Sequence, residues 1–127
     1  MSDSVGPKEP DLSIPPGPTL NQGRLESIAR DASREFLIEL AQLFTRDVEE
    51  RIQCLAVIVH SRDVPGVASA AHRVQSAAAS LGVLRLRSLA ASLEKHAEGE
   101  DWRRVERALE RLTTEFSHVK SVLEAMR

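Results

Sequence analysis

The distribution of proline along the chain constrains its fold more than any other feature. Five of the six prolines fall within the first 18 residues, and only Pro65 follows them. Because proline lacks a backbone donor and breaks helices, residues 1–18 are expected to form a flexible, Pro/Gly-rich tail. Residues 19–127 are free to form long helices, and their number suits one helical domain.

The composition favours packed helices and a soluble protein. Aromatic residues make up 3% of the chain and hydrophobic residues 42%, so a core must be built mainly from Leu, Val, Ile and Ala. The formal net charge of −2 argues against a nucleic-acid partner, which usually requires a basic excess. No apolar run approaches the roughly 20 residues of a membrane span, and no signal peptide begins the chain. We therefore expect a cytoplasmic protein that does not enter a membrane.

The spacing of apolar residues predicts the first two helices. A short helix is expected near residues 20–30, and a long one near residues 32–62. Steps of three and four place the apolar residues of the long helix on one stripe. They are Phe36, Leu37, Leu40, Leu43, Phe44, Val48, Ile52, Leu55, Ile58 and Val59.

Capping residues delimit the remaining helices. Asp63 is expected to cap a third helix that ends at Gly82. A fourth is expected over residues 83–97, and Asp101 is expected to cap the last, whose apolar seam runs over residues 102–126. The chain is thus predicted to be all-α, an antiparallel four-helix bundle with a short additional N-terminal helix. The seam could also join a homodimer, but packing within one bundle is simpler and favours a monomer.

One histidine in the third helix lies on the face opposite the core. At about 100° per residue, six small or weakly polar residues fall within about 60° of His72. They are Pro65, Ala68, Ser69, Gln75, Ser76 and Ala79. An imidazole, whose unperturbed pKa is about 6.5, is partly neutral and nucleophilic near neutral pH. His72 is therefore a candidate nucleophile open to a partner protein, although an ordinary surface histidine remains the alternative.

Residues 70–82 resemble the histidine-containing phosphotransfer (HPt) domain. The resemblance begins with His72, which follows a small residue. It continues with the apolar Val74, the run of Ala and Ser after it, and Leu81-Gly82. It extends over about residues 20–126. It implies a phosphorelay intermediate that carries a phosphoryl group on His72 and exchanges it with aspartates of receiver domains.

Two residues next to the histidine depart from the family pattern. Gln75 stands where the family usually has a lysine beside the phosphoryl group, and Ser76 stands where it usually has glycine. Gln75 can donate a hydrogen bond but cannot neutralise charge. Arg73, about 100° round the helix, could supply the missing charge, although a solvated side chain is the simpler interpretation. His72, Gln75 and Ser76 are the predicted catalytic residues.

The resemblance also implies the partners. They are response-regulator receiver domains and hybrid histidine kinases, and the receiver would supply Mg²⁺. The chain would need no cofactor of its own and would have no ATP-dependent kinase activity. The expected partner-binding residues around the histidine are Ala68, Ser69, Arg73, Ala79 and Val83.

Three other functions compete with phosphotransfer. A degenerate HPt-like module would bind a receiver or kinase without carrying phosphate, as Gln75 suggests. The phosphoacceptor helix of a histidine kinase usually has an acidic residue after the histidine and then a proline, whereas Arg73 follows here and no proline does. A helical adaptor could instead associate through the apolar seam of residues 102–126.

Overall fold

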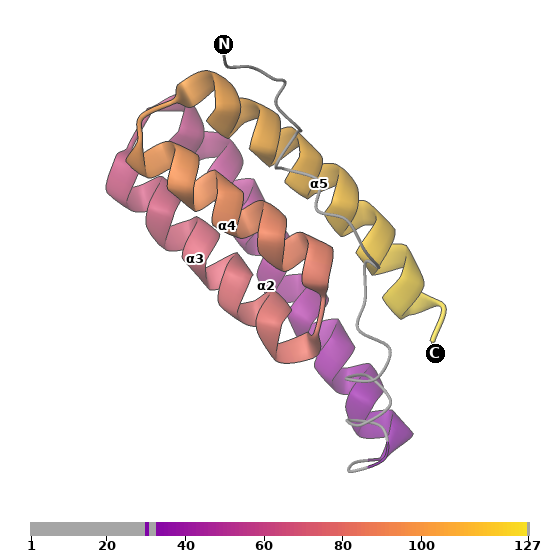
Figure 1. Ribbon diagram of the computed structural model, residues 1–127. Helices are drawn as coiled ribbons and strands as arrows, with labels where there is room; N and C mark the ends of the chain where they lie inside the picture. Colours follow the sequence, from indigo (N-terminus) through magenta and orange to yellow (C-terminus); the bar gives the residue numbers. More distant parts are fainter. Residues whose placement is uncertain (1–29, 31–32, 127) are drawn as a thin grey trace.

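Arg30 and residues 33–126 are described by the computed structural model, and they form an antiparallel helical bundle. The helices are α2 (Arg34–His60), α3 (Val64–Leu81), α4 (Leu84–Glu98) and α5 (Trp102–Glu124). Figure 1 shows them side by side, joined by short turns. α3 packs on α2 and α4, and α5 packs on α4 and α2, which closes the bundle. The all-α, four-helix prediction is confirmed. The predicted tail of residues 1–18 lies outside the described residues, and so does the predicted helix near residues 20–30 except for Arg30.

Local hydrogen bonds fix where the helices begin and end. The carboxylate of Asp63 accepts from the Gly66 backbone N–H at 3.1 Å, and that of Asp101 accepts from the Arg104 N–H at 3.3 Å. Both predicted caps are confirmed, and each satisfies a backbone donor of the first helical turn. Gly82 ends α3 in the left-handed conformation, at φ 77°, as its position predicts.

The core is aliphatic, and all four helices contribute to it. On α5 the seam residues Val105, Leu112, Phe116, Val119 and Leu123 are buried among the other helices. Trp102 and Met126, at the ends of the seam, pack half-buried against the same core. The seam is therefore used within a single bundle. None of the helices in the described part of the chain is long and apolar enough to cross a membrane.

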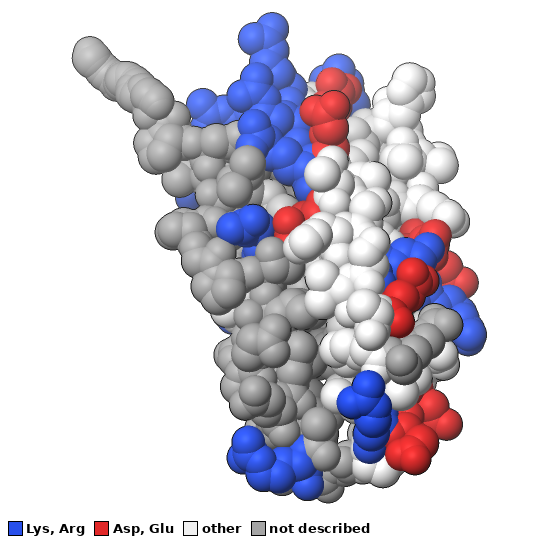
Figure 2. Space-filling model, turned by 90° about the vertical axis from the view of Figure 1, so that its right-hand side faces the viewer, with Lys and Arg blue, Asp and Glu red and all other residues white. Residues whose placement is uncertain are grey.

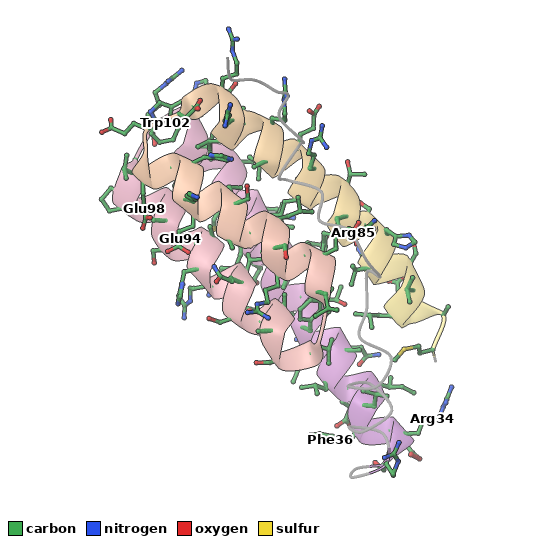
Figure 3. All side chains as sticks on the ribbon, viewed as in Figure 1. Arg34, Phe36, Arg85, Glu94, Glu98 and Trp102 are labelled. Carbon is green, nitrogen blue, oxygen red and sulfur yellow. The ribbon has the colours of Figure 1, made fainter. Side chains whose placement is uncertain are left out.

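Two residues of the predicted stripe on α2 are exposed instead of buried. Phe36 is 51% and Leu43 59% exposed. Both lie more than about 100° round the helix from Val48, which is fully buried, so they sit at the edge of the stripe. The first turns of α2, which carry Phe36, also extend beyond the connection between α3 and α4 (Figures 1 and 3). Apolar spacing gives the direction of a buried stripe, whereas the neighbouring helices set its width.

Charged side chains of both signs share the surface. On the face in Figure 2, Lys and Arg side chains form small groups that mostly adjoin Asp or Glu, with uncharged residues between them. One cationic side chain, Arg62, lies over the ring of Trp102, 5.6 Å from its centroid, where the turn after α2 meets the start of α5. A cation near an aromatic face is attracted to it, so this contact helps to hold that end of the bundle together.

Two leucines on α2 test the boundary of the core. Leu55→Ala should lower the free energy of unfolding by about 2–5 kcal/mol, because Leu55 is fully buried and its removal leaves a cavity. The exposed Leu43→Ala should change it by less than about 0.5 kcal/mol. Urea unfolding measures both. Equal losses for the two variants would contradict the assignment of Leu43 to the surface.

Candidate functional site

α3 divides its residues between the core and the solvent, and His72 lies on the solvent side. The buried side holds Val67, Ala71, Val74, Ala78 and Leu81. The side chain of His72 is 63% exposed, as the helical spacing predicts. The imidazole therefore stands at the surface of a helix that is anchored along its opposite face.

Short side chains surround the imidazole on α3. Ser69, Ser76 and Ala79 are exposed and Ala68 is half-buried, and none of them is long enough to cover the ring. Such a face usually carries long charged residues. A partner can therefore reach the ring closely without displacing a bulky side chain.

A carboxylate from α4 faces one nitrogen of the ring. Glu94 Oε1 lies 3.6 Å from His72 Nδ1, with the Glu94 side chain 24% exposed (Figure 3 labels Glu94). This distance is longer than a hydrogen bond, but the negative oxygen still attracts a proton on Nδ1 and repels a lone pair there. The carboxylate thus favours the tautomer protonated on Nδ1. That tautomer leaves the lone pair on Nε2, which is then the nucleophilic atom.

Gln75 holds this carboxylate in place. Its Nε2 donates a hydrogen bond to the same Glu94 oxygen, at 3.1 Å. The half-buried Gln75 side chain is therefore directed toward α4, and it is linked to His72 through Glu94. Glu94 was not among the predicted site residues, because it lies on another helix, 19 residues from Gln75. Only the packing of α4 on α3 brings it to the histidine.

An open hollow borders the other side of the histidine, toward α2. It is lined by Asp47, His72, Arg73, Ser76, Ala77 and Ser80. In an imidazole, Nδ1 lies on one edge of the ring, and Nε2 and Cδ2 lie on the other. Because the Nδ1 edge faces α4, the Nε2 edge is turned toward α2 and this hollow. The structure thus brings Arg73 and Ser76 to the hollow on the Nε2 side of the ring, and Gln75 to the Nδ1 side.

An apolar groove between α2 and α3 continues from this hollow. Its lining is Leu40, Leu43, Phe44, Asp47, Ala77, Ser80 and Leu81. Asp47, Ala77 and Ser80 belong to both the groove and the hollow. The exposed Leu43 thus offers an apolar contact beside the histidine, in a groove that sequence reasoning did not predict because residues of two helices form it.

Val83 corrects the predicted partner-binding set. It is fully buried, so it cannot contact a partner. The prediction placed Val83, just after the end of the third helix, among the apolar contacts for a partner, and α3 does end at Gly82. The Val83 N–H then donates back to the Ala78 carbonyl at 2.9 Å, and the chain reverses direction there. The reversal directs the Val83 side chain into the core.

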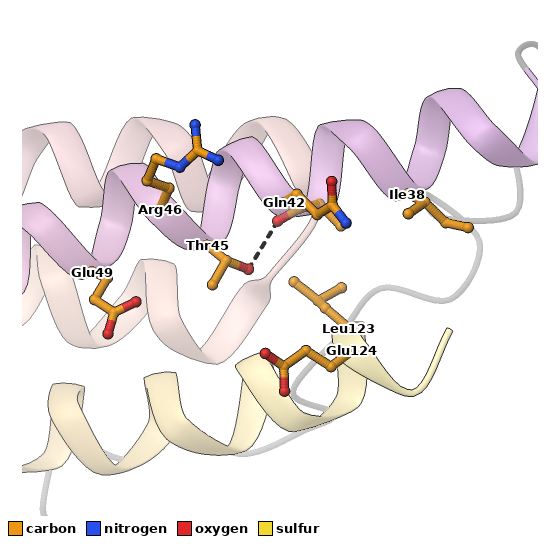
Figure 4. A pocket seen from close by; sticks show the side chains of 8 residues that line it. Ile38, Gln42, Thr45, Arg46, Glu49, Leu123 and Glu124 are labelled. Carbon is orange, nitrogen blue, oxygen red and sulfur yellow. Dashed lines mark hydrogen bonds between the residues drawn. The ribbon is translucent and has the colours of Figure 1, made fainter. Parts of the chain in front are cut away.

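A hollow larger than the one beside His72 lies elsewhere, between α2 and α5 (Figure 4). Its lining is Ile38, Ala41, Gln42, Thr45, Arg46, Glu49, Leu123 and Glu124. It contains no histidine or cysteine, and the Thr45 hydroxyl donates to the Ala41 carbonyl at 2.8 Å. Within the described residues, no group of three or more His, Cys, Asp or Glu could hold a metal ion. The best candidate site is therefore the surface around His72.

Comparisons with known proteins agree with this choice. Residues 39–125 match the family model described as the Hpt domain. The fold is similar to that of histidine-containing phosphotransfer protein B (HptB) from Pseudomonas aeruginosa PAO1, with a TM-score of 0.80 and 22% identity over 87% of this chain and 95% of that one. It is also similar to that of ZmHP2, a histidine-containing phosphotransfer protein from maize, with a TM-score of 0.78 and 18% identity over 85% of this chain and 82% of that one. No curated protein matches the sequence.

The influence of Glu94 on the imidazole can be measured directly. At about pH 9, where an imidazole is neutral, Glu94→Ala should raise the share of His72 protonated on Nε2. The reason is that the carboxylate favouring a proton on Nδ1 is gone. Nitrogen-15 shifts of His72 report the two tautomers. Glu98→Ala, an exposed acid one turn along α4, is the control and should leave the shifts unchanged. Unchanged tautomer populations in Glu94→Ala would contradict the role given to Glu94.

Proposed function

The chain belongs to the Hpt domain family, and on this basis we propose that it is a phosphorelay intermediate that carries a phosphoryl group on His72. One observation carries the proposal: the ring is 63% exposed, with Nδ1 beside a carboxylate and Nε2 turned to an open hollow. A nucleophilic nitrogen must be reachable by a large partner, and this one is. The phosphoryl group would be exchanged with aspartates of receiver domains.

The reaction requires little of this chain beyond a positioned nucleophile. His72 Nε2 attacks the phosphorus of the partner's aspartyl phosphate, so that a P–N bond forms as the P–O bond to the aspartate breaks. The carboxylate of the partner is the leaving group, and the proton on Nδ1 stays beside Glu94. We assign the Mg²⁺ to the receiver. Positioning and charge stabilisation then account for most of the rate, and the reverse reaction charges the receiver.

The surface around His72 suits docking of a receiver or hybrid kinase. Ala68, Ser69 and Ala79 allow close approach along α3. The apolar groove with Leu43 on its rim supplies burial beside the reacting atoms. An apolar centre with a polar surround is the usual arrangement of a protein interface. We therefore propose that the partner covers α3 and the adjacent side of α2.

The rival function is docking without transfer, and Gln75 favours it. Gln75 is neutral, and its amide is bound to Glu94, so it cannot replace the lysine that the family usually has there. A module that lost this charge could keep its partner surface and lose the chemistry. Phosphotransfer and binding must therefore be measured separately.

Phosphotransfer from a phosphorylated receiver tests the main proposal. The wild-type chain should acquire an acid-labile, base-stable phosphoryl label, and His72→Ala should acquire none, because the acceptor nitrogen is gone. His118→Ala, which removes an exposed histidine on α5, should be labelled like the wild type. Receiver binding without any label would support the docking module instead. A label that persists in His72→Ala would refute His72 as the acceptor.

Binding of the same receiver tests the proposed docking surface. Leu43→Ala should weaken binding by about fivefold, since an apolar contact beside the histidine is lost. Val57→Ala, on the same helix but outside the groove, is the matched control because Val57 is 70% exposed. Titration calorimetry gives both affinities. Equal affinity of the Leu43 and Val57 variants would place the interface elsewhere.

A further inference from the structure

The charge that Gln75 lacks has another source near the histidine. Resting on the proposed function, we propose that Arg73 binds the phosphoryl group on His72 Nε2 and neutralises part of its charge. Arg73 lines the same hollow as His72 and Ser76. The cation would thus come from the residue directly after the histidine, on the α2 side of the ring.

The orientation of the imidazole determines which neighbours can contact the phosphoryl group. Glu94 lies at the Nδ1 edge, 3.6 Å away, so the P–N bond at Nε2 would extend from the edge nearer α2. Gln75 lies on the α4 side, where its amide donates to Glu94. Arg73 lies about 100° round the helix from His72, on the side of α2. The phosphoryl oxygens would therefore come near Arg73 and Ser76 and away from Gln75.

The guanidinium of Arg73 is available for this role. Its side chain is exposed, and among the described residues it has no hydrogen-bond or ion-pair partner. A guanidinium presents several donors in a plane and binds phosphate oxygens in pairs. Ser76, one turn after His72, adds a hydroxyl donor at the same hollow. No contact in the described structure has to break for Arg73 to turn toward a phosphoryl group.

Asp47 is the acidic residue of the hollow. Because its negative charge repels a phosphoryl group, a cation is needed there to offset that repulsion. Its Oδ1 lies 3.6 Å from Nε of Arg51, one turn along α2, at the partly exposed surface. Arg51 offsets only part of that charge, because partly exposed pairs interact weakly. A phosphoryl group with a charge of about −2 would be repelled by Asp47 and attracted by Arg73. The two residues should therefore affect phosphorylation in opposite directions.

Phosphoramidate, a small anionic phosphoryl donor, tests this on the full chain without any receiver. His72 Nε2 attacks its phosphorus, the P–N bond to the ring forms as the donor's own P–N bond breaks, and ammonia leaves. Phosphorus-31 NMR follows the label, and labelling of His72→Ala is subtracted to remove reaction at other histidines. Both the rate of labelling and the half-life of the phosphohistidine are recorded.

At low salt Arg73→Ala should slow labelling of His72 by roughly threefold to tenfold relative to the wild type. High salt should bring the two rates closer together, because it screens the charge of Arg73. Arg73→Lys should keep most of the rate, since it keeps the charge. Asp47→Asn should speed labelling. Arg107→Ala is the matched control: Arg107 is exposed on α5, which packs mainly on α4 and α2. Its rate should equal that of the wild type at every salt concentration.

The outcomes separate this inference from the proposed function. Equal rates for the Arg73→Ala and Arg107→Ala variants at low salt would overturn the role of Arg73, whatever a receiver does. A loss that Arg73→Lys fails to restore, or that salt leaves unchanged, would also overturn it. A chain that phosphoramidate labels through Arg73 but that no receiver ever labels would sink the proposed function and leave the inference standing.

Discussion

The packing of α3 between α2 and α4 is the constraint on which the site depends. Its buried side consists of Val67, Ala71, Val74, Ala78 and Leu81, of which two are alanines with no exposed surface. Small buried residues let neighbouring helices approach closely, since the side chains at a contact set the distance between helix axes. That approach brings Glu94 of α4 and Asp47 of α2 to opposite sides of a single histidine. The same packing fixes the helix, so the imidazole is held on a rigid element while it remains exposed.

The two edges of the imidazole have different surroundings, and the proposed chemistry depends on this difference. The Nδ1 edge faces a carboxylate that is itself held by Gln75. The Nε2 edge faces an open hollow with hydroxyl, guanidinium and carboxylate groups. One edge favours a proton, and the other is accessible to a phosphoryl donor. A surface histidine without this asymmetry would lack a neighbouring group that favours a proton on Nδ1 and so leaves Nε2 free to react.

Sequence reasoning succeeded where local chemistry decides the structure. Asp63 and Asp101 cap helices because a short acidic side chain reaches a backbone N–H three residues on. The exposure of His72 follows from helical spacing alone, since the apolar residues of α3 gather on the other face. The prediction was wrong at Val83, which was expected on the partner surface just after Gly82 but is buried, and at Phe36 and Leu43, where the width of an apolar stripe was assumed. In each failure the answer depended on which helix lies next to the residue.

The sequence by itself determined that the chain forms amphipathic helices, where most of them begin and end, and that His72 faces outward among small residues. These follow from proline positions, capping residues and a 3.6-residue period, all of which act over a few residues. The tertiary structure alone decided that Glu94 lies beside the histidine and that Gln75 is directed toward α4. It also decided that α2 lines a hollow on the other side of the ring. Those relations join residues from separate helices, and only the packing of side chains in the core sets the order and register in which the helices meet.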